Sequence, residues 1–519
     1  MRRALLILVA AVAVLAVLTV GAAVPAPAEG TDVGHRVENL EVPNSVTCPV
    51  PTQPCDRKVK VHLWYPADRQ GFSQAPKTEY TSALYGLPEP GALSWKVEAE
   101  IARESGAIDP QGQPFPVIVF SHGAVNDPID YAHTLELIAA GGFVVAAPYH
   151  ANNTQDDVRI DFMNARGATF PCSDGLAGPC ARTDVPNSMR DRVNDISHIL
   201  DALPDWFGDR VDATRAGVLG HSRGTVTALA AAGGSTAWGF GPLRTPGGQP
   251  MVKAVMGMAI GAPAITFAAN LATVTVPAVL VAGGRDRNSV QQVSEDAFEA
   301  VSSADKLFVG IPNATHRSFD STYCGQLQSA GAAFDLDHDG VVELSDLDTD
   351  GDRVVERSEL DSTRAILDLH TVRLIAASPP GGNSGKAVHY CAAEFFTSPV
   401  DIRELVGALA GEAPSSEFSC SDEGGRRVCA PVRGPSSVCL TDTVPCTGLD
   451  TDEVKDGVKE IAAAFFASAL KRTGNDGIHF TRYLAPKWLM EHVPMVGSAR
   501  AYAGPGSVCP PGQGVICSD

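Results

Sequence analysis

A serine flanked by glycines stands out in the stretch 215–232 (RAGVLGHSRGTVTALAAA), which reads as a short apolar strand, an abrupt turn and a small-residue helix. The serine is Ser222, with Gly220 and Gly224 two positions away on either side. On a strand-to-helix turn of this kind the hydroxyl projects above the sheet, and the glycines let neighbouring backbone approach closely. The pattern predicts a serine nucleophile. The alternative is an ordinary Gly/Ser surface turn.

An acid and a base follow the serine along the chain. A serine hydroxyl is a poor nucleophile until a histidine accepts its proton and a carboxylate orients that histidine. Asp286 follows the apolar run 277–282, and His316 follows the next apolar run, 307–311. We therefore expect Ser222, Asp286 and His316 to act as nucleophile, acid and base. A turn aspartate and a surface histidine are the alternatives.

Two backbone N–H groups are expected to stabilise the negative charge that develops during attack by the serine. One belongs to Arg223, directly after the nucleophile. The other is predicted in the loop 121–124, here called the oxyanion loop, where Gly123 allows close approach and Ala124 supplies the N–H group. His122 lies in this loop and is interpreted as structural. His150 is expected either at the mouth of the pocket or in a turn.

Short apolar runs alternate with helical stretches through the first 320 residues. The runs are nearly continuous, which is typical of parallel strands buried on both faces, whereas 58–66 alternates like a half-buried strand. The expected buried strands are 116–120, 143–147, 216–219, 254–260, 277–282 and 307–311. The expected helices are 129–140, 188–203, 224–232, 290–301 and 451–471, with a further helical stretch at 95–104. Residues 30–56 look turn-rich. This pattern predicts an α/β fold with a mostly parallel central sheet and helices on both faces.

The N-terminus and the charge indicate an exported protein. Arg2 and Arg3 precede an uncharged run, 4–24, and a small-residue cleavage candidate before Glu29, which predicts a signal peptide. If it is not cleaved, this run is long enough to anchor the chain in a membrane. The 60 acidic and 40 basic residues give a formal charge of -20, which argues against a nucleic-acid surface.

The chain has 12 cysteines, which fit an exported protein. Most lie in close pairs, for which local disulfides are the simplest arrangement, although sequence does not prove connectivity. The predicted pairs are Cys48 with Cys55, Cys172 with Cys180, Cys420 with Cys429, Cys439 with Cys446, and Cys509 with Cys517. Cys324 and Cys391 would then close a long loop. A zinc site is disfavoured because there is no C-x2-C pair.

An acidic insert carries two phased copies of a twelve-residue calcium-loop pattern. The first copy departs from the pattern by ending in aspartate, and the second by having Arg353 where a glycine is expected. The predicted ligands are Asp335, Asp337, Asp339, Val341, Glu343 and Asp346 in the first loop, and Asp348, Asp350, Asp352, Val354, Glu356 and Glu359 in the second. We expect structural Ca²⁺ that clamps the loop carrying His316. An acidic linker, or calcium at a remote site, is the alternative.

Several motifs together resemble the α/β-hydrolase serine esterases of the platelet-activating-factor acetylhydrolase type, with similarity to chlorophyllase and dienelactone-hydrolase relatives. They are VHLWYPAD, PVIVFSHG, GGFVVAAPYHANNT, RDRVNDISHILDAL, AGVLGHSRGT, VLVAGGRD and NATHRSF, in this order. The resemblance covers roughly 57–320 and a C-terminal helix. It implies ester hydrolysis through an acyl-enzyme at Ser222, with Asp286 and His316 and without a catalytic cofactor. Thr225 departs from the family, which usually has a second glycine there, and Arg223 is less common than an apolar residue.

The expected organisation follows from these patterns. The segments are a signal peptide (1–28), an α/β-hydrolase core (35–324), a tandem EF-hand-like insert (325–364), a continuation of the hydrolase (365–411), a Cys-rich insertion (412–450), a C-terminal helical part of the hydrolase (451–498) and a disulfide-stapled tail (499–519).

We therefore expect a secreted serine esterase or lipase that acts on a small-molecule or lipid ester. No nucleic-acid partner is expected, and no stable membrane association after signal cleavage. The sequence does not indicate the oligomeric state. Two alternatives remain open: an extracellular calcium-binding or adhesion-type protein on an inactive hydrolase scaffold, and an acyltransferase that uses the same three residues.

Overall fold

The computed structural model describes the chain in segments: residues 32–45, 55–68, 72–81, 96–104, 106–124, 126–154, 157, 185–233, 242–261, 271–284, 286, 289–322, 418–423, 426–431, 451–471, 484–504, 512 and 514–517. The predicted signal peptide, both predicted calcium loops and most of the paired cysteines lie outside these residues. No helix in the described part of the chain is long and apolar enough to cross a membrane.

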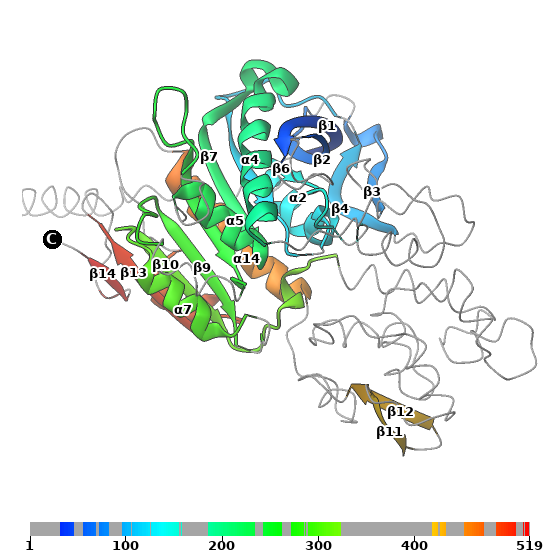
Figure 1. The fold of residues 1–519 in the computed structure, drawn as a ribbon, viewed down its shortest axis with the longest axis vertical. Coiled ribbons are helices and arrows are strands. Elements are labelled where there is room, and N and C mark those ends of the chain that lie inside the picture. The colour runs from blue at the N-terminus through cyan, green and yellow to red at the C-terminus, as the bar shows by residue number, and fades with distance from the viewer. Residues whose placement is uncertain are drawn as a thin grey trace, which may run out of the picture.

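One large sheet organises the described residues (Figure 1). Its order is β14-β13-β10-β9-β8-β7-β5-β6-β2-β1-β4-β3. The strands are β1 (Val33–Ser45), β2 (Cys55–Pro66), β3 (Lys77–Thr81), β4 (Lys96–Glu104), β5 (Phe115–Ser121), β6 (Val144–Pro148), β7 (Val211–His221), β8 (Val252–Met258), β9 (Ala278–Gly283), β10 (Lys306–Ile311), β13 (Ser498–Ala503) and β14 (Val515–Cys517). A separate hairpin contains β11 (Phe418–Glu423) and β12 (Arg426–Pro431).

The centre of the sheet is parallel from β6 to β10. β2 pairs antiparallel with β6, and β13 pairs antiparallel with β10. Every residue of β6 and β9 is buried, because both faces of these strands are covered. The expected parallel strands are confirmed, and the protein is a mixed α/β protein with a large sheet and helices.

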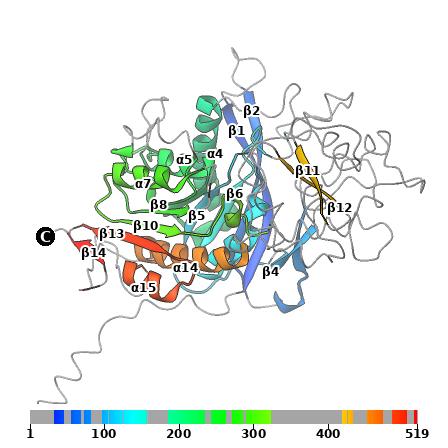
Figure 2. The same ribbon diagram turned by 90° about the horizontal axis from the view of Figure 1, so that it is seen from below.

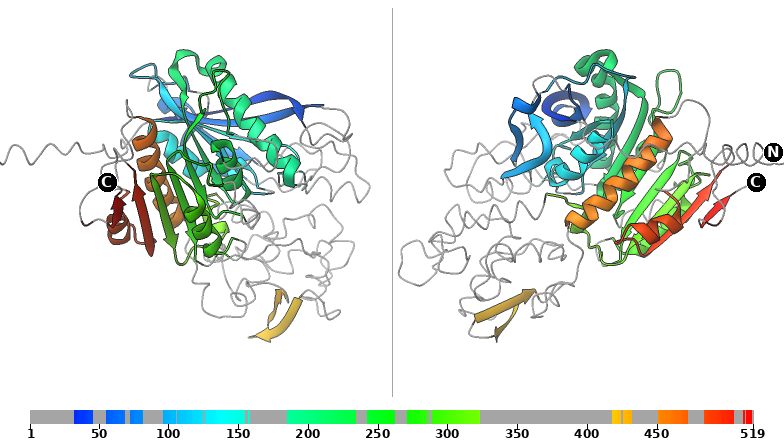
Figure 3. Two further views of the ribbon diagram at one scale, coloured as in Figure 1. Left: turned by 60° about the vertical axis from the view of Figure 1, so that its left-hand side comes forward. Right: turned by 180° about the vertical axis from the view of Figure 1, so that it is seen from behind.

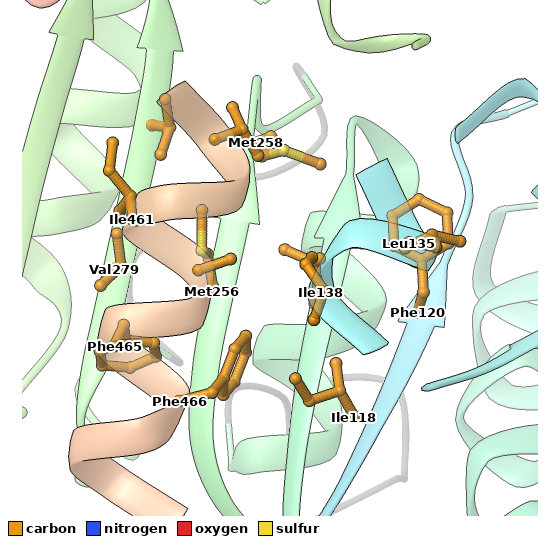
Figure 4. Close-up of a cluster of buried hydrophobic side chains, with 14 of the residues drawn as sticks. Ile118, Phe120, Leu135, Ile138, Met256, Met258, Val279, Ile461, Phe465 and Phe466 are labelled. Carbon is orange, nitrogen blue, oxygen red and sulfur yellow. The ribbon is translucent and has the colours of Figure 1, made fainter. Parts of the chain in front are cut away.

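Helices cover both faces of the sheet (Figure 2). One face packs against α2 (Ala132–Ala140), α14 (Thr451–Leu470) and α15 (Pro486–His492). The other packs against α4 (Val185–Phe207), α5 (Arg223–Ala232) and α7 (Gln291–Ala300). In the first layer, Ile461 and Phe465 of α14, Ile138 of α2 and Met256 of β8 belong to one buried cluster (Figure 4).

Helix α14 comes from late in the sequence, yet it lies across the same face as α2 (Figure 3). Its Phe466 is fully buried against β7. A Cβ atom added to Gly217 of β7 would come within 2.5 Å of the Phe466 ring, so the glycine makes room for the aromatic side chain. The helix and the strand that leads to Ser222 are therefore packed directly on each other.

Three expectations about local structure were wrong. The predicted helical stretch at 95–104 is strand β4, in which Val97 and Ala99 are buried and Glu98 is exposed, so a period of two prevails over the helix-forming residues. The turn-rich region contains β1, which pairs with β2. The segment expected to be only a stapled tail contributes β13 and β14 to the sheet.

The register of the β11–β12 hairpin is informative about one cysteine pair. The backbone of Cys420 lies directly opposite that of Cys429. This is the pairing expected from the sequence. The disulfides themselves remain predictions.

A buried carboxylate explains how β4 is attached to the helix layer. Glu136 of α2 accepts the backbone N–H groups of Glu100, Ile101 and Ala102, at 2.8, 3.0 and 2.6 Å. Burial raises the pKa of Glu136 to about 7, although the three N–H groups oppose the shift. The side chain therefore titrates near neutral pH.

Replacing this carboxylate should change how stability depends on pH. The folded-state pKa of Glu136 lies above its unfolded value of 4.5, so its proton-linked stabilisation is complete below about pH 4.5 and is lost as the pH rises to about 7. The unfolding free energy of the wild type, minus that of Glu136→Gln, should fall by roughly 3 kcal/mol across this range. Urea titrations of both proteins at several pH values measure this difference. A difference that stays constant with pH would contradict the assignment.

Candidate active site

Ser222 occupies a strained turn between β7 and α5. Its backbone has φ 53° and ψ −117°, a conformation that non-glycine residues rarely adopt. The Ser222 N–H donates to the carbonyl of Met258 at 2.9 Å, and the Ser222 carbonyl accepts the N–H of Thr225 at 3.0 Å. The strained turn persists because β8 and the first turn of α5 hold it on both sides.

The two flanking glycines are required by direct backbone contacts. A Cβ atom on Gly220 would lie 2.1 Å from the carbonyl oxygen of Gly224, within the same turn. A Cβ atom on Gly224 would lie 1.8 Å from the carbonyl oxygen of Ser121, at the end of β5. No side chain fits at either position, and the turn packs directly against the start of the oxyanion loop.

Thr225 fits where the resembling family usually has a glycine. Its hydroxyl lies 2.9 Å from the carbonyl oxygen of Gly220 and 2.7 Å from that of Met258. A Cβ atom on Gly257 would come 2.2 Å from the Thr225 methyl group. Gly257 of β8 thus makes room for the threonine methyl group, and the threonine hydroxyl links the turn to β8.

Asp286 and His316 form a buried pair after β9 and β10. His316 Nδ1 lies 2.8 Å from Asp286 Oδ2, and Asp286 Oδ1 accepts the N–H of Ser289 at 2.7 Å. Gly283 lets the two loops touch, since a Cβ atom there would lie 2.5 Å from the carbonyl oxygen of Ala314. The carboxylate thus orients the imidazole and assigns the proton to Nδ1.

His221 connects the turn that carries Ser222 to the loop that carries His316. Its Nε2 lies 3.1 Å from the His316 carbonyl oxygen, so this nitrogen carries a proton, and its Nδ1 accepts the hydroxyl of Tyr131 at 2.7 Å. The His221 and His316 rings are 4.7 Å apart between centroids. Burial holds the pKa of His221 well below its usual value, so the ring is neutral. The structure therefore brings Asp286 and His316 beside the turn that carries Ser222.

Arg192 of α4 orients the oxyanion loop. Its guanidinium donates to the carbonyl oxygens of His122 and Gly123, at 2.6 and 3.1 Å. In a trans peptide the N–H group points away from the carbonyl, so Arg192 directs the N–H groups of Gly123 and Ala124 to the opposite side. The Gly123 N–H meets the Tyr131 hydroxyl at 3.4 Å. This orientation suits Ala124 as a donor to a reacting oxygen.

A second Ser-His-Asp arrangement lies behind this loop. Ser121 Oγ is 2.9 Å from His150 Nε2, and His150 Nδ1 is 2.8 Å from Asp195 Oδ2. Asp195 also pairs with Arg57. The three members are at most 1% exposed, so they brace the loop and are closed to a substrate. The expectation that His150 lies at a pocket mouth or in a turn missed this role.

His122 has the structural role expected of it. Its Nε2 accepts the backbone N–H of His150 at 3.1 Å, and its Nδ1 donates to the Gly123 carbonyl at 2.8 Å. Burial holds its pKa well below the usual value, so it stays neutral.

Two residues of α4 that hold the oxyanion loop and His150 in place were not predicted from the sequence. Arg192 and Asp195 are three positions apart, which places them on one face of a helix that was itself expected. That spacing is the signal that could have identified them. The sequence of α4 contains no motif that shows which of its faces contacts the oxyanion loop.

Metal ligands are absent from the part of the chain seen here. Among the described residues, no group of three or more His, Cys, Asp or Glu side chains could hold a metal ion. Both predicted calcium loops, from Asp335 to Glu359, lie outside those residues.

Comparisons with known proteins give a distant structural similarity and no sequence match. No family model matches the chain, and no curated protein matches its sequence. Among solved structures, it is similar to a ferulic acid esterase from Streptomyces cinnamoneus, with 20% sequence identity, a TM-score of 0.36, and coverage of 57% of this chain and 78% of that chain. The class that the coordinates define is a mixed α/β protein, and the family resemblance remains an interpretation of the motifs.

Adding one methyl group at Gly224 tests the close approach of this residue to the Ser121 carbonyl. Gly224→Ala forces its Cβ against the Ser121 carbonyl, so the unfolding free energy should fall by about 1–3 kcal/mol or more. Gly247→Ala is the matched control, because the nearest atom to a Cβ there is 3.8 Å away. Urea titration of both variants measures the effect. Equal stability of the two variants would contradict the packing described.

Proposed function

We propose that the protein is a secreted serine hydrolase with an α/β-hydrolase fold, which cleaves carboxylic esters through an acyl-enzyme at Ser222. One observation carries the proposal: Ser222 sits in a strained turn after β7, beside a hydrogen-bonded Asp286–His316 pair. The three residues follow β7, β9 and β10, which are parallel, so their loops meet at one edge of the sheet. The chain order Ser, Asp, His also supports this fold.

The proposed chemistry begins at the histidine. With its Nδ1 proton donated to Asp286, the neutral imidazole of His316 has Nε2 as its acceptor, and this nitrogen takes the proton as Ser222 Oγ attacks the ester carbonyl. A bond forms between Ser222 Oγ and the carbonyl carbon, and the electron pair moves to the oxygen. Asp286 stabilises the imidazolium that results.

The N–H groups of Arg223 and Ala124 are assigned to the oxyanion. Arg223 begins α5, whose N-terminal end also favours negative charge. When the intermediate collapses, the alcohol leaves with the proton from His316. Water then attacks the acyl-enzyme in the same manner and releases the acid. No catalytic cofactor is part of this proposal.

The proposal also includes secretion of the protein and binding of structural Ca²⁺. The N-terminal signal supports secretion, and the tandem acidic loops support structural Ca²⁺ through carboxylate and carbonyl oxygens, which this ion prefers. The calcium would brace the chain after His316. The substrate is a small-molecule or lipid ester, with no nucleic acid involved.

A fluorophosphonate probe tests the nucleophile. The wild type should be labelled at Ser222, and Ser222→Ala should lose labelling and at least ~10³-fold in kcat on p-nitrophenyl esters. Ser302→Ala removes the hydroxyl of an exposed serine and should retain both. Failure of the folded wild type to label would indicate an inactive scaffold. Product analysis with an alcohol acceptor would reveal acyl transfer in place of hydrolysis.

Chelation tests the calcium clamp. Removing calcium from the full-length protein should lower the melting temperature and the esterase activity together, and added Ca²⁺ should restore both, because ligand binding to the folded state stabilises it. Asp335→Ala together with Asp348→Ala should reproduce the effect of the chelator. Unchanged activity in verifiably calcium-free protein would contradict the clamp.

A further inference from the structure

Arg223 carries a charge that its surroundings do not neutralise. It begins α5 directly after Ser222, and burial lowers the pKa of its guanidinium. Its NH1 nitrogen is buried without a hydrogen-bond partner. Among the described residues, no carboxylate forms an ion pair with it. A largely buried cation without a partner costs free energy, so it calls for a compensating role.

Arg57 shows how the same chain treats a buried guanidinium that is purely structural. It is 1% exposed and pairs with two carboxylates, through Nε to Asp191 at 3.6 Å and through NH2 to Asp195. Arg223 has neither kind of partner, although it lies one residue from the candidate nucleophile. Arg57 thus has carboxylates that offset its charge, whereas Arg223 has none among the described residues.

The surroundings of Arg223 contain a second buried cation. Arg192 lies close by, and its pKa is lowered by burial first and then by the charge of Arg223. Arg192 itself is bound to uncharged acceptors only, in the oxyanion loop and at Asn153. Two guanidinium groups that have no carboxylate ion pair among the described residues thus lie near each other, and their positive charge suits an anion.

We propose that Arg223 forms a subsite beside Ser222 for an anionic group of the substrate, either a carboxylate or a phosphate. The planar guanidinium fork binds both groups through paired hydrogen bonds. The substrate class is then an ester that carries a negative charge near its scissile bond. This inference rests on the proposed ester hydrolysis, but the anion subsite can be tested without turnover.

Paired substrates test the preference directly. The probes are p-nitrophenyl esters of a fatty acid and of a dicarboxylic acid of the same length. The wild type should show a higher kcat/KM for the dicarboxylic half-ester, and Arg223→Met should reduce the ratio of the two values by about tenfold or more. Arg223→Lys should give an intermediate ratio, because it keeps the charge and loses the fork.

Arg244→Gln is the matched control, since it removes an equal charge from an exposed position and should leave the ratio unchanged. A ratio in Arg223→Met equal to that of the wild type would overturn the subsite. So would an equal fall in Arg244→Gln, because the preference would then come from the overall charge.

Calorimetric titration with glutarate and with inorganic phosphate provides a readout besides activity. Both should bind the wild type more tightly than Arg223→Met, and the tighter of the two identifies the preferred anionic group. Equal binding to the wild type and the variant would overturn the subsite. Fluorophosphonate labelling in parallel separates the two ideas: labelling at Ser222 without anion binding refutes the subsite alone, whereas anion binding without labelling refutes the esterase.

Discussion

The contact between Gly224 and the Ser121 carbonyl is the constraint on which the rest of the site depends. It joins the turn that carries Ser222 to the end of β5 with no side chain between them, so the position of the turn is tied to that of the oxyanion loop. Arg192 then fixes the same loop from the other side through its carbonyls. Backbone contact thus positions the turn that carries Ser222. The same contact and the Arg192 side chain together position the oxyanion loop.

Three buried, neutral histidines connect polar groups around the site. His122, His150 and His221 all have their pKa values lowered by burial, and each has one ring nitrogen that donates and one that accepts. The resulting network connects the oxyanion loop, α4 and the loop of His316. The hydrogen bonds of these histidines link segments that are far apart in the sequence. His316 differs from these three in its 2.8 Å contact with Asp286, the carboxylate that follows β9.

The central strands and the helices were predictable because continuous apolar runs and their spacing are local signals. The glycine-serine turn and the later Asp286 and His316 were predictable for a similar reason, since each follows a recognisable strand. Strand β4 was not, because its glutamates and lysine favour helix and only its alternation and the Glu136 contact make it a strand. Arg192 and the Ser121–His150–Asp195 array were not predicted, because the spacing of Arg192 and Asp195 shows that they share a helix face but not which distant segment that face contacts.

Helix α14 has a consequence for how the protein is made. All three proposed catalytic residues are synthesised before residue 320, but Phe466 and Ile461 complete the apolar layer under β7 and β8. A nascent chain that ends before α14 leaves that layer open to water. The polypeptide must therefore be translated beyond α14 before this layer of its core can close.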